Sequence, residues 1–332
     1  RSRGLGDVYK RQVQSLGLPG DPCPMCQAEA GLFVLDDVPD YYKAVITSNE
    51  ACDGSVATSI IQDWLIDKPL FAMPQPMQFG DPLVHKHCMK EIEEAWKFIE
   101  EQTGAKWSWD AYFSAMKRFN EETRYELEKW EVNKTAYPQI IGPSYELFRK
   151  WNYEMDGGID PRVIKTCEKV SKLIREAYEN RDEAWPGKMK YRAIVWSCPA
   201  HYYANFSNWA ANCWGINIVL NMDSTMGHNM INTEDPDEAI KDLALFSEKA
   251  AMRHHAVGGW DNVNAIWEWA KNFNCDMVLM NDNIACKGML GVHALMEEQA
   301  RDLGFHFIFI EHDLEDCRTV SRQDMHNCVN GY

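Results

Sequence analysis

Residues 276–311 read DMVLMNDNIACKGMLGVHALMEEQARDLGFHFIFIE. This stretch opens with a short apolar run, continues with apolar residues at helical period and ends with a second apolar run. A strand, a helix and a strand in this order form a unit whose two strands are parallel. We therefore predict strands at Asp276–Asn281 and His306–Glu311 and a helix at Met289–Leu303.

The same alternation continues towards the N-terminus of this stretch. Strands are predicted at Tyr191–Trp196 and Ile216–Met222, and helices near Tyr203–Cys213 and at Pro236–Arg253 and Asp261–Asn272. Strands alternating with helices are typical of a doubly wound α/β domain. Near the N-terminus a second strand, helix and strand are predicted at Tyr42–Thr47, Ser55–Ile66 and Leu70–Met73.

A helical region separates these two parts of the chain. Residues 81–152 are dense in Glu, Lys and Trp at helical period, and a further helix is predicted at Pro161–Asn180, where Pro161 suits the first turn. The predicted fold class is α/β, with two Rossmann-like, doubly wound parallel-sheet lobes joined by a helical region. The predicted divisions are a non-native leader at 1–12, an N-terminal α/β lobe at 13–80 whose truncation is left open, the helical region at 81–185 and a C-terminal α/β lobe at 186–332.

The composition and net charge indicate a globular protein that does not bind nucleic acid or membranes. The 332 residues are 45% hydrophobic and 25% charged, as in a globular protein with a buried core. The 34 Lys and Arg against 50 Asp and Glu give a net charge of -16, which disfavours nucleic acid and anionic membranes as partners. No apolar run reaches the roughly 18 residues that a membrane-spanning helix needs.

Cysteines follow several of the predicted strands. There are eleven in all, an odd number that favours free thiols in a reducing cytosol. Cys52, Cys198 and Cys286 each come after a predicted strand and close to the start of a helix, where the helix dipole favours the thiolate form that binds metal. The Cys23-Pro24-Met25-Cys26 pair alone is compatible with a redox disulfide, half a zinc site or two unrelated thiols.

Motifs at both ends of the chain resemble one known family. Cys23 with Gly31 eight residues on, then Lys43–Asp53 (KAVITSNEACD), is similar to the N-terminal signature of the 2-hydroxyacyl-CoA dehydratase and benzoyl-CoA reductase family. The closing stretch agrees, with Asp276–Met280, Cys286 and Ile310–Asp313 in the family's order. The resemblance spans about residues 21–332 and implies a subunit like the 2-hydroxyglutaryl-CoA dehydratase D-component.

The resemblance implies one 4Fe-4S cluster held by three cysteines. Carried over residue by residue, the ligands are Cys23, Cys52 and Cys286, with Cys26 left open as an alternative first ligand. Three thiolates leave one iron open to substrate, as a catalytic zinc keeps one open position. One-electron reduction of a thioester would then give a ketyl radical that expels the neighbouring hydroxyl group.

A carboxylate near the cluster is expected to accept the β-proton of the substrate. Glu50, two residues before Cys52, is the candidate, and a solvated loop charge is the alternative. Glu311 and Asp313 follow a predicted strand and face the same crevice by the topological rule. Neither is given a role, and capping of the following turn is the alternative for both.

The implied function is the 4Fe-4S subunit of an oxygen-sensitive 2-hydroxyacyl-CoA dehydratase in the cytoplasm. The implied partners are a related second subunit, an acyl-CoA substrate and an ATP-dependent iron-sulfur activator; the chain itself has no phosphate-loop or dinucleotide fingerprint. A benzoyl-CoA reductase-type subunit that reduces an aryl-CoA, and a non-catalytic electron-relay partner subunit, stay open. So does a zinc or dithiol protein built on Cys23 and Cys26.

Overall fold

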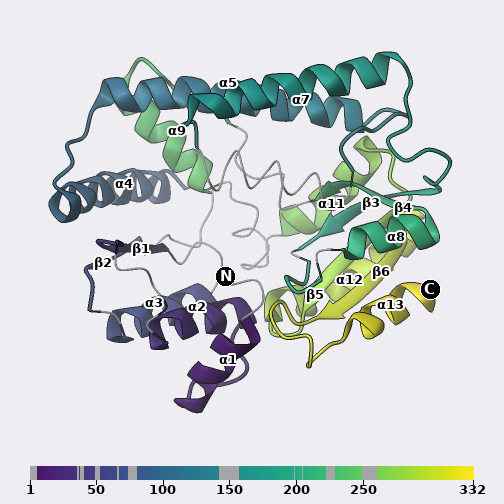
Figure 1. The fold of residues 1–332 in the computed structure, drawn as a ribbon, viewed down its shortest axis with the longest axis horizontal. Coiled ribbons are helices and arrows are strands. Elements are labelled where there is room, and N and C mark those ends of the chain that lie inside the picture. Colours follow the sequence, from purple (N-terminus) through teal and green to yellow (C-terminus); the bar gives the residue numbers. More distant parts are fainter. Residues whose placement is uncertain are drawn as a thin grey trace.

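The computed structural model describes most of the chain. The described residues are 6–35, 37, 41–48, 53–65, 67–73, 81–141, 157–197, 199–203, 205–221, 229–248 and 260–332. Within them the protein is mixed α/β, with two parallel sheets and many helices (Figure 1). Among these residues, no helix combines the length and the apolar character of a membrane span.

The larger sheet has four strands that are all parallel. Its spatial order is β4-β3-β5-β6, and β3 pairs with both β4 and β5. The chain therefore leaves β3 towards one side of the sheet and later returns to its other side, which places the topological switch point between β3 and β5. The strands are β3 (Tyr191–Trp196), β4 (Ile216–Asn221), β5 (Met277–Asn283) and β6 (His306–His312).

Helices cover both faces of this sheet. Alternate residues of β5 enter two separate apolar clusters: Val278 and Met280 pack with helices α11 and α12, whereas Leu279 packs with α8 and α13. Burial on both faces explains why β4 and β5 are buried at every position. The bounds are α8 (Phe206–Trp214), α11 (Trp260–Asn272), α12 (Lys287–Leu303) and α13 (Arg322–Asn330).

The helical region consists of long capped helices. Helices α5 and α7 lie side by side, and Trp130 of α5 enters the core of the larger sheet (Figure 1). Asp160 caps the start of α7 by accepting from the N–H of Arg162, with Pro161 in the first turn as predicted. The bounds are α4 (Pro82–Thr103), α5 (Trp109–Asn133), α7 (Pro161–Glu179) and α9 (Pro236–Glu248).

The N-terminal part contains three helices and the smaller sheet. Strands β1 and β2 pair in parallel, in register from Val45 opposite Leu70 to Ser48 opposite Met73, as the predicted strand-helix-strand unit requires. Helix α2 packs against both α1 and α3. The bounds are α1 (Gly6–Ser15), α2 (Pro24–Val34), β1 (Val45–Ser48), α3 (Asp53–Leu65) and β2 (Leu70–Met73).

The structure confirms a mixed α/β fold with parallel sheets. The arrangement as two Rossmann-like lobes and the four domain divisions stay predictions. Residues 6–12 of the predicted leader belong to α1, and Tyr9 and Lys10 on this helix are buried.

Gly31 allows α1 and α2 to approach closely. A Cβ atom at this position would overlap the backbone carbonyl group of Tyr9. We expect Gly31→Ala to destabilise the protein by about 1–3 kcal/mol, because the two helices must separate to admit the methyl group. Denaturant unfolding of the purified chain measures this change.

Gly291 provides the matched control in helix α12. Nothing lies within 4 Å of a Cβ built there, so Gly291→Ala should stabilise the chain by about 0.5–1 kcal/mol through helix propensity. Equal effects at the two glycines would contradict the close-approach explanation for Gly31.

Candidate functional site

The candidate site lies where β3 and β5 end. Ser197, directly after β3, has φ 72°, a left-handed conformation that is uncommon for a residue with a side chain. The side-chain amide of Asn281 on β5 donates to the Ser197 carbonyl oxygen at 3.4 Å. The contact ties the carboxyl ends of the two strands together at the switch point, where open α/β sheets bind ligands.

Two of the predicted ligands occupy helix N-caps. Cys23 precedes α2 and Cys286 precedes α12, and neither uses its side chain to cap the helix. Each sulfur atom therefore lies beside a helix N-terminus, whose partial positive charge favours a thiolate. Both cysteines are partly buried.

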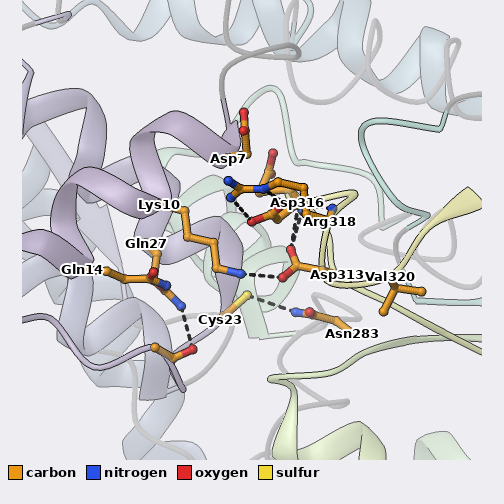
Figure 2. A network of polar contacts seen from close by, with 12 residues as sticks. Asp7, Lys10, Gln14, Cys23, Gln27, Asn283, Asp313, Asp316, Arg318 and Val320 are labelled. Carbon is orange, nitrogen blue, oxygen red and sulfur yellow. Dashed lines mark hydrogen bonds and ion pairs between the residues drawn. The ribbon is translucent and has the colours of Figure 1, made fainter.

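Asn283 joins these two cysteines across the length of the chain. Its side-chain nitrogen donates to the sulfur of Cys23 at 3.4 Å (Figure 2). Its backbone carbonyl oxygen accepts from the N–H of Cys286 at 2.7 Å. The second hydrogen bond closes a tight turn between β5 and α12. One residue at the end of β5 thus brings the N-terminal cysteine to the start of α12.

Gln27 fixes the loop that leads into Cys23. Its side-chain nitrogen donates to the carbonyl oxygen of Pro22 at 2.6 Å and to that of Gly20 at 3.3 Å. Its side-chain oxygen accepts from Gln14 of α1 at 2.6 Å, and the Gln27 side chain is fully buried. The backbone before Cys23 is therefore held by both α1 and α2.

A buried ion pair connects α1 to the end of β6. Lys10 Nζ lies 2.5 Å from Asp313 Oδ2, and the two side chains are 10% and 0% exposed. The other carboxylate oxygen of Asp313 accepts from the backbone N–H groups of Glu315 and Asp316, both at 2.9 Å. Asp313 therefore caps the turn that follows it, which is the alternative predicted for this side chain from the sequence.

The same turn carries a second ion pair. Arg318 donates to both oxygens of Asp316, and these hydrogen bonds lower the pKa of the Asp316 carboxyl, as does the charge of Lys10 more weakly. Figure 2 shows both pairs on one side of Cys23. On this side of Cys23 the charged groups are held in ion pairs with each other.

Asp282 is a buried carboxyl group at the same edge of the sheet. It is 0% exposed, and within the described part of the chain neither carboxylate oxygen has a hydrogen-bond partner. Burial, together with the charge of Glu311 at the paired position of β6, raises its pKa to about 7. This group can hold or release a proton near neutrality.

The other predicted site residues lie outside the described residues. These are Cys52 and Glu50, together with Cys198; α3 begins at Asp53, the residue after Cys52. Within the described ranges, no three His, Cys, Asp or Glu side chains gather as a metal site. That search did not include Cys52, so the predicted trio of cysteines stays a prediction.

Sequence reasoning missed the residues that support the cysteines. Asn283 and Lys10 were not singled out, although Asn283 follows a predicted strand as the cysteines do. Lys10 fell in the predicted leader and carried no signal in its own neighbourhood. Its partner Asp313 was noted, because it ends a strand.

The fold and the site define a parallel-sheet α/β protein with two cysteines at helix N-caps near the carboxyl end of β5, beside its switch point. The chain matches the family described as 2-hydroxyglutaryl-CoA dehydratase, D-component, over residues 1–325, and it belongs to that family. It is therefore related to one component of a dehydratase. A comparison with curated proteins finds no match.

Proposed function

We propose that this chain is the subunit of a 2-hydroxyacyl-CoA dehydratase that holds a 4Fe-4S cluster through Cys23, Cys52 and Cys286. The reaction removes water from a 2-hydroxyacyl-CoA to give the 2-enoyl thioester. The family membership supports the dehydratase chemistry. Asn283, which lies three residues before Cys286, contacts the sulfur of Cys23. This contact supports the ligand set and carries the proposal.

The donor set fits an iron-sulfur cluster. Such clusters are held by cysteine thiolates, and two of the three proposed ligands stand at helix N-caps near one turn. Cys23 is favoured over Cys26 because its sulfur accepts from Asn283. Held by Cys23, Cys52 and Cys286, such a cluster would supply one-electron reduction of the acyl thioester, the chemistry that would activate the neighbouring hydroxyl group as a leaving group.

The protein's own residues prepare this site. The N-termini of α2 and α12 favour negative charge, which stabilises thiolates and the sulfides that accompany them. The amide of Asn283 directs an N–H donor to the Cys23 sulfur, and such bonds help to set the potential of a cluster. These groups are in place before any substrate arrives.

Proton transfer is proposed for Glu50, two residues before Cys52. Asp313 is not available for it, since both of its carboxylate oxygens are occupied by Lys10 and by backbone N–H groups.

Membership of a family of dehydratase components implies that this chain acts together with other proteins. We propose a related second subunit and an ATP-dependent iron-sulfur activator that delivers the electron, because this chain has no phosphate-binding fingerprint of its own. An oxygen-sensitive cluster held by thiolates fits the reducing cytoplasm. The substrate is proposed to be an acyl-CoA with a hydroxyl group at carbon 2.

Anaerobic purification followed by iron and sulfide analysis tests the cluster. We expect a brown protein with about four irons per chain after reconstitution, as a 4Fe-4S cluster requires. A colourless chain without iron would refute the proposal, as would full iron retention in the combined Cys23, Cys52 and Cys286 to Ser variant. Turnover of a 2-hydroxyacyl-CoA but not of an aryl-CoA, with the second subunit and activator present, tests the reaction.

A further inference from the structure

We propose that the Lys10–Asp313 ion pair is a positioning device that holds Cys23 against the turn between β5 and α12. The inference rests on the proposed function for its purpose, because it assigns the pair to the assembly of the cysteine ligands. The positioning itself is a property of the metal-free chain. It can be tested whether or not a cluster binds.

The contacts around Cys23 form a closed ring (Figure 2). From Asp313 at the end of β6 the ring passes through Lys10 and Gln14 of α1 to Gln27 of α2. It continues through the Pro22 carbonyl group to Cys23 and returns to the sheet at Asn283. Since β5 and β6 are paired neighbours, with Asn283 opposite His312, the two anchoring points lie side by side.

Helices α1 and α2 transmit this anchoring as one unit. The overlap that a Cβ at Gly31 would make with Tyr9 shows how closely the two backbones pack. A displacement of α1 from Asp313 therefore moves α2 and the Cys23 at its start. The bond that links Cys23 directly to the sheet, from the side-chain nitrogen of Asn283 to the Cys23 sulfur at 3.4 Å, is weak by comparison.

Because the Lys10–Asp313 ion pair is buried, it determines how helix α1 packs against the end of β6. Lys10 and Asp313 are nearly inaccessible to water, so removing either partner leaves the other charge without compensation. A lysine side chain that crosses between segments 303 residues apart also fixes which turn of α1 meets β6. Gly6, one helical turn earlier, packs against Glu315 of the same loop and sets the same register.

The decisive variant is Lys10→Met combined with Asp313→Asn. It removes both charges together, so no unpaired charge remains, and the Asn side-chain oxygen can still accept from Glu315 and Asp316. The matched control is Lys129→Met with Glu126→Gln. That pair is also buried, at 1% and 2% exposure with Nζ and Oε2 3.0 Å apart, but it lies within α5 and does not join α1 to β6.

The readout is cross-linking of thiols in the metal-free full-length chain. Dibromobimane bridges neighbouring thiols, and peptide mass spectrometry identifies the Cys23–Cys286 product. We expect this product in the wild type and in the α5 control, and about a tenfold lower yield in the Lys10 and Asp313 variant, because loss of positioning sharply reduces the chance that two groups meet. Far-ultraviolet circular dichroism checks that all three chains are folded.

Two results would overturn the inference: absence of the Cys23–Cys286 product in the wild type, and equal yields in the two double variants. Iron content after reconstitution separates the inference from the proposed function. A cross-link that depends on Lys10 and Asp313 in a chain that never binds iron would support the positioning and refute the cluster. Iron binding that survives with unchanged cross-linking in the Lys10 and Asp313 variant would support the cluster and refute the positioning.

Discussion

Replacing Cys286 by Ser is expected to remove the iron of the reconstituted protein and to lower the rate of substrate dehydration more than about 100-fold. Loss of a residue that only hydrogen-bonds a metal ligand already costs up to about 100-fold, so loss of the ligand itself should cost more. The serine hydroxyl group keeps the size of the side chain but is a far weaker ligand than a thiolate. The N-cap position and the turn to Asn283 use backbone atoms, so the fold should persist. Iron analysis, the visible absorption of the cluster and turnover with the second subunit and activator measure the effect.

Cys26 supplies the matched control in α2. It lies in the first turn of the helix whose N-cap position Cys23 occupies, and it is also partly buried. We expect Cys26→Ser to retain iron and Cys23→Ser to lose it. The opposite pattern would transfer the ligand role to Cys26, and retention of iron in both variants would contradict a ligand from α2 altogether.

The strands were the part of the fold that the sequence predicted best. β2 and β3 have the predicted bounds, and β5 extends two residues further than predicted, to Asn283. Strands buried on both faces appear as unbroken apolar runs, which are visible in a single sequence. The continuation of β5 through polar residues, which includes Asn283, had no such signal.

Helices α1 and α13 were not predicted because their apolar faces are narrow. In α13 only Met325 and Val329 are buried, and its start is defined by the capping box of Ser321 and Asp324. Helix α1 is held by one tyrosine, one valine and the buried Lys10. Too few apolar positions recur in either helix to establish a period.

Local patterns in the sequence indicated a candidate cysteine but not the residues that contact it. Cys286 follows a predicted strand at the start of a helix, whereas Cys23 was proposed as a ligand from the resemblance to the dehydratase family. The bonds that place them join residues 260 and 303 positions apart, and no local pattern indicates which partners meet.

Asp282 adds a dependence of stability on pH. Its carboxyl group is buried at the end of β5 opposite Glu311, and burial followed by the charge of Glu311 raises its pKa from 3.8 to about 7. Between these two values the unfolded state ionises while the folded state keeps its proton. The stabilisation is therefore complete below pH 4 and is lost as the pH rises through 7.

Asp282→Asn should remove this dependence, because the amide has no proton to lose. The difference in unfolding free energy between Asp282→Asn and the wild type should be near zero at pH 4 and should grow to about 4 kcal/mol in favour of the variant at pH 8, since each pKa unit corresponds to 1.36 kcal/mol. Glu311→Gln removes one cause of the raised pKa, so it should shift the loss of stability to lower pH and make it smaller. Urea unfolding of the three chains across this range measures the differences. A difference between Asp282→Asn and the wild type that stays constant with pH would show that Asp282 ionises in the folded protein as it does in the unfolded chain.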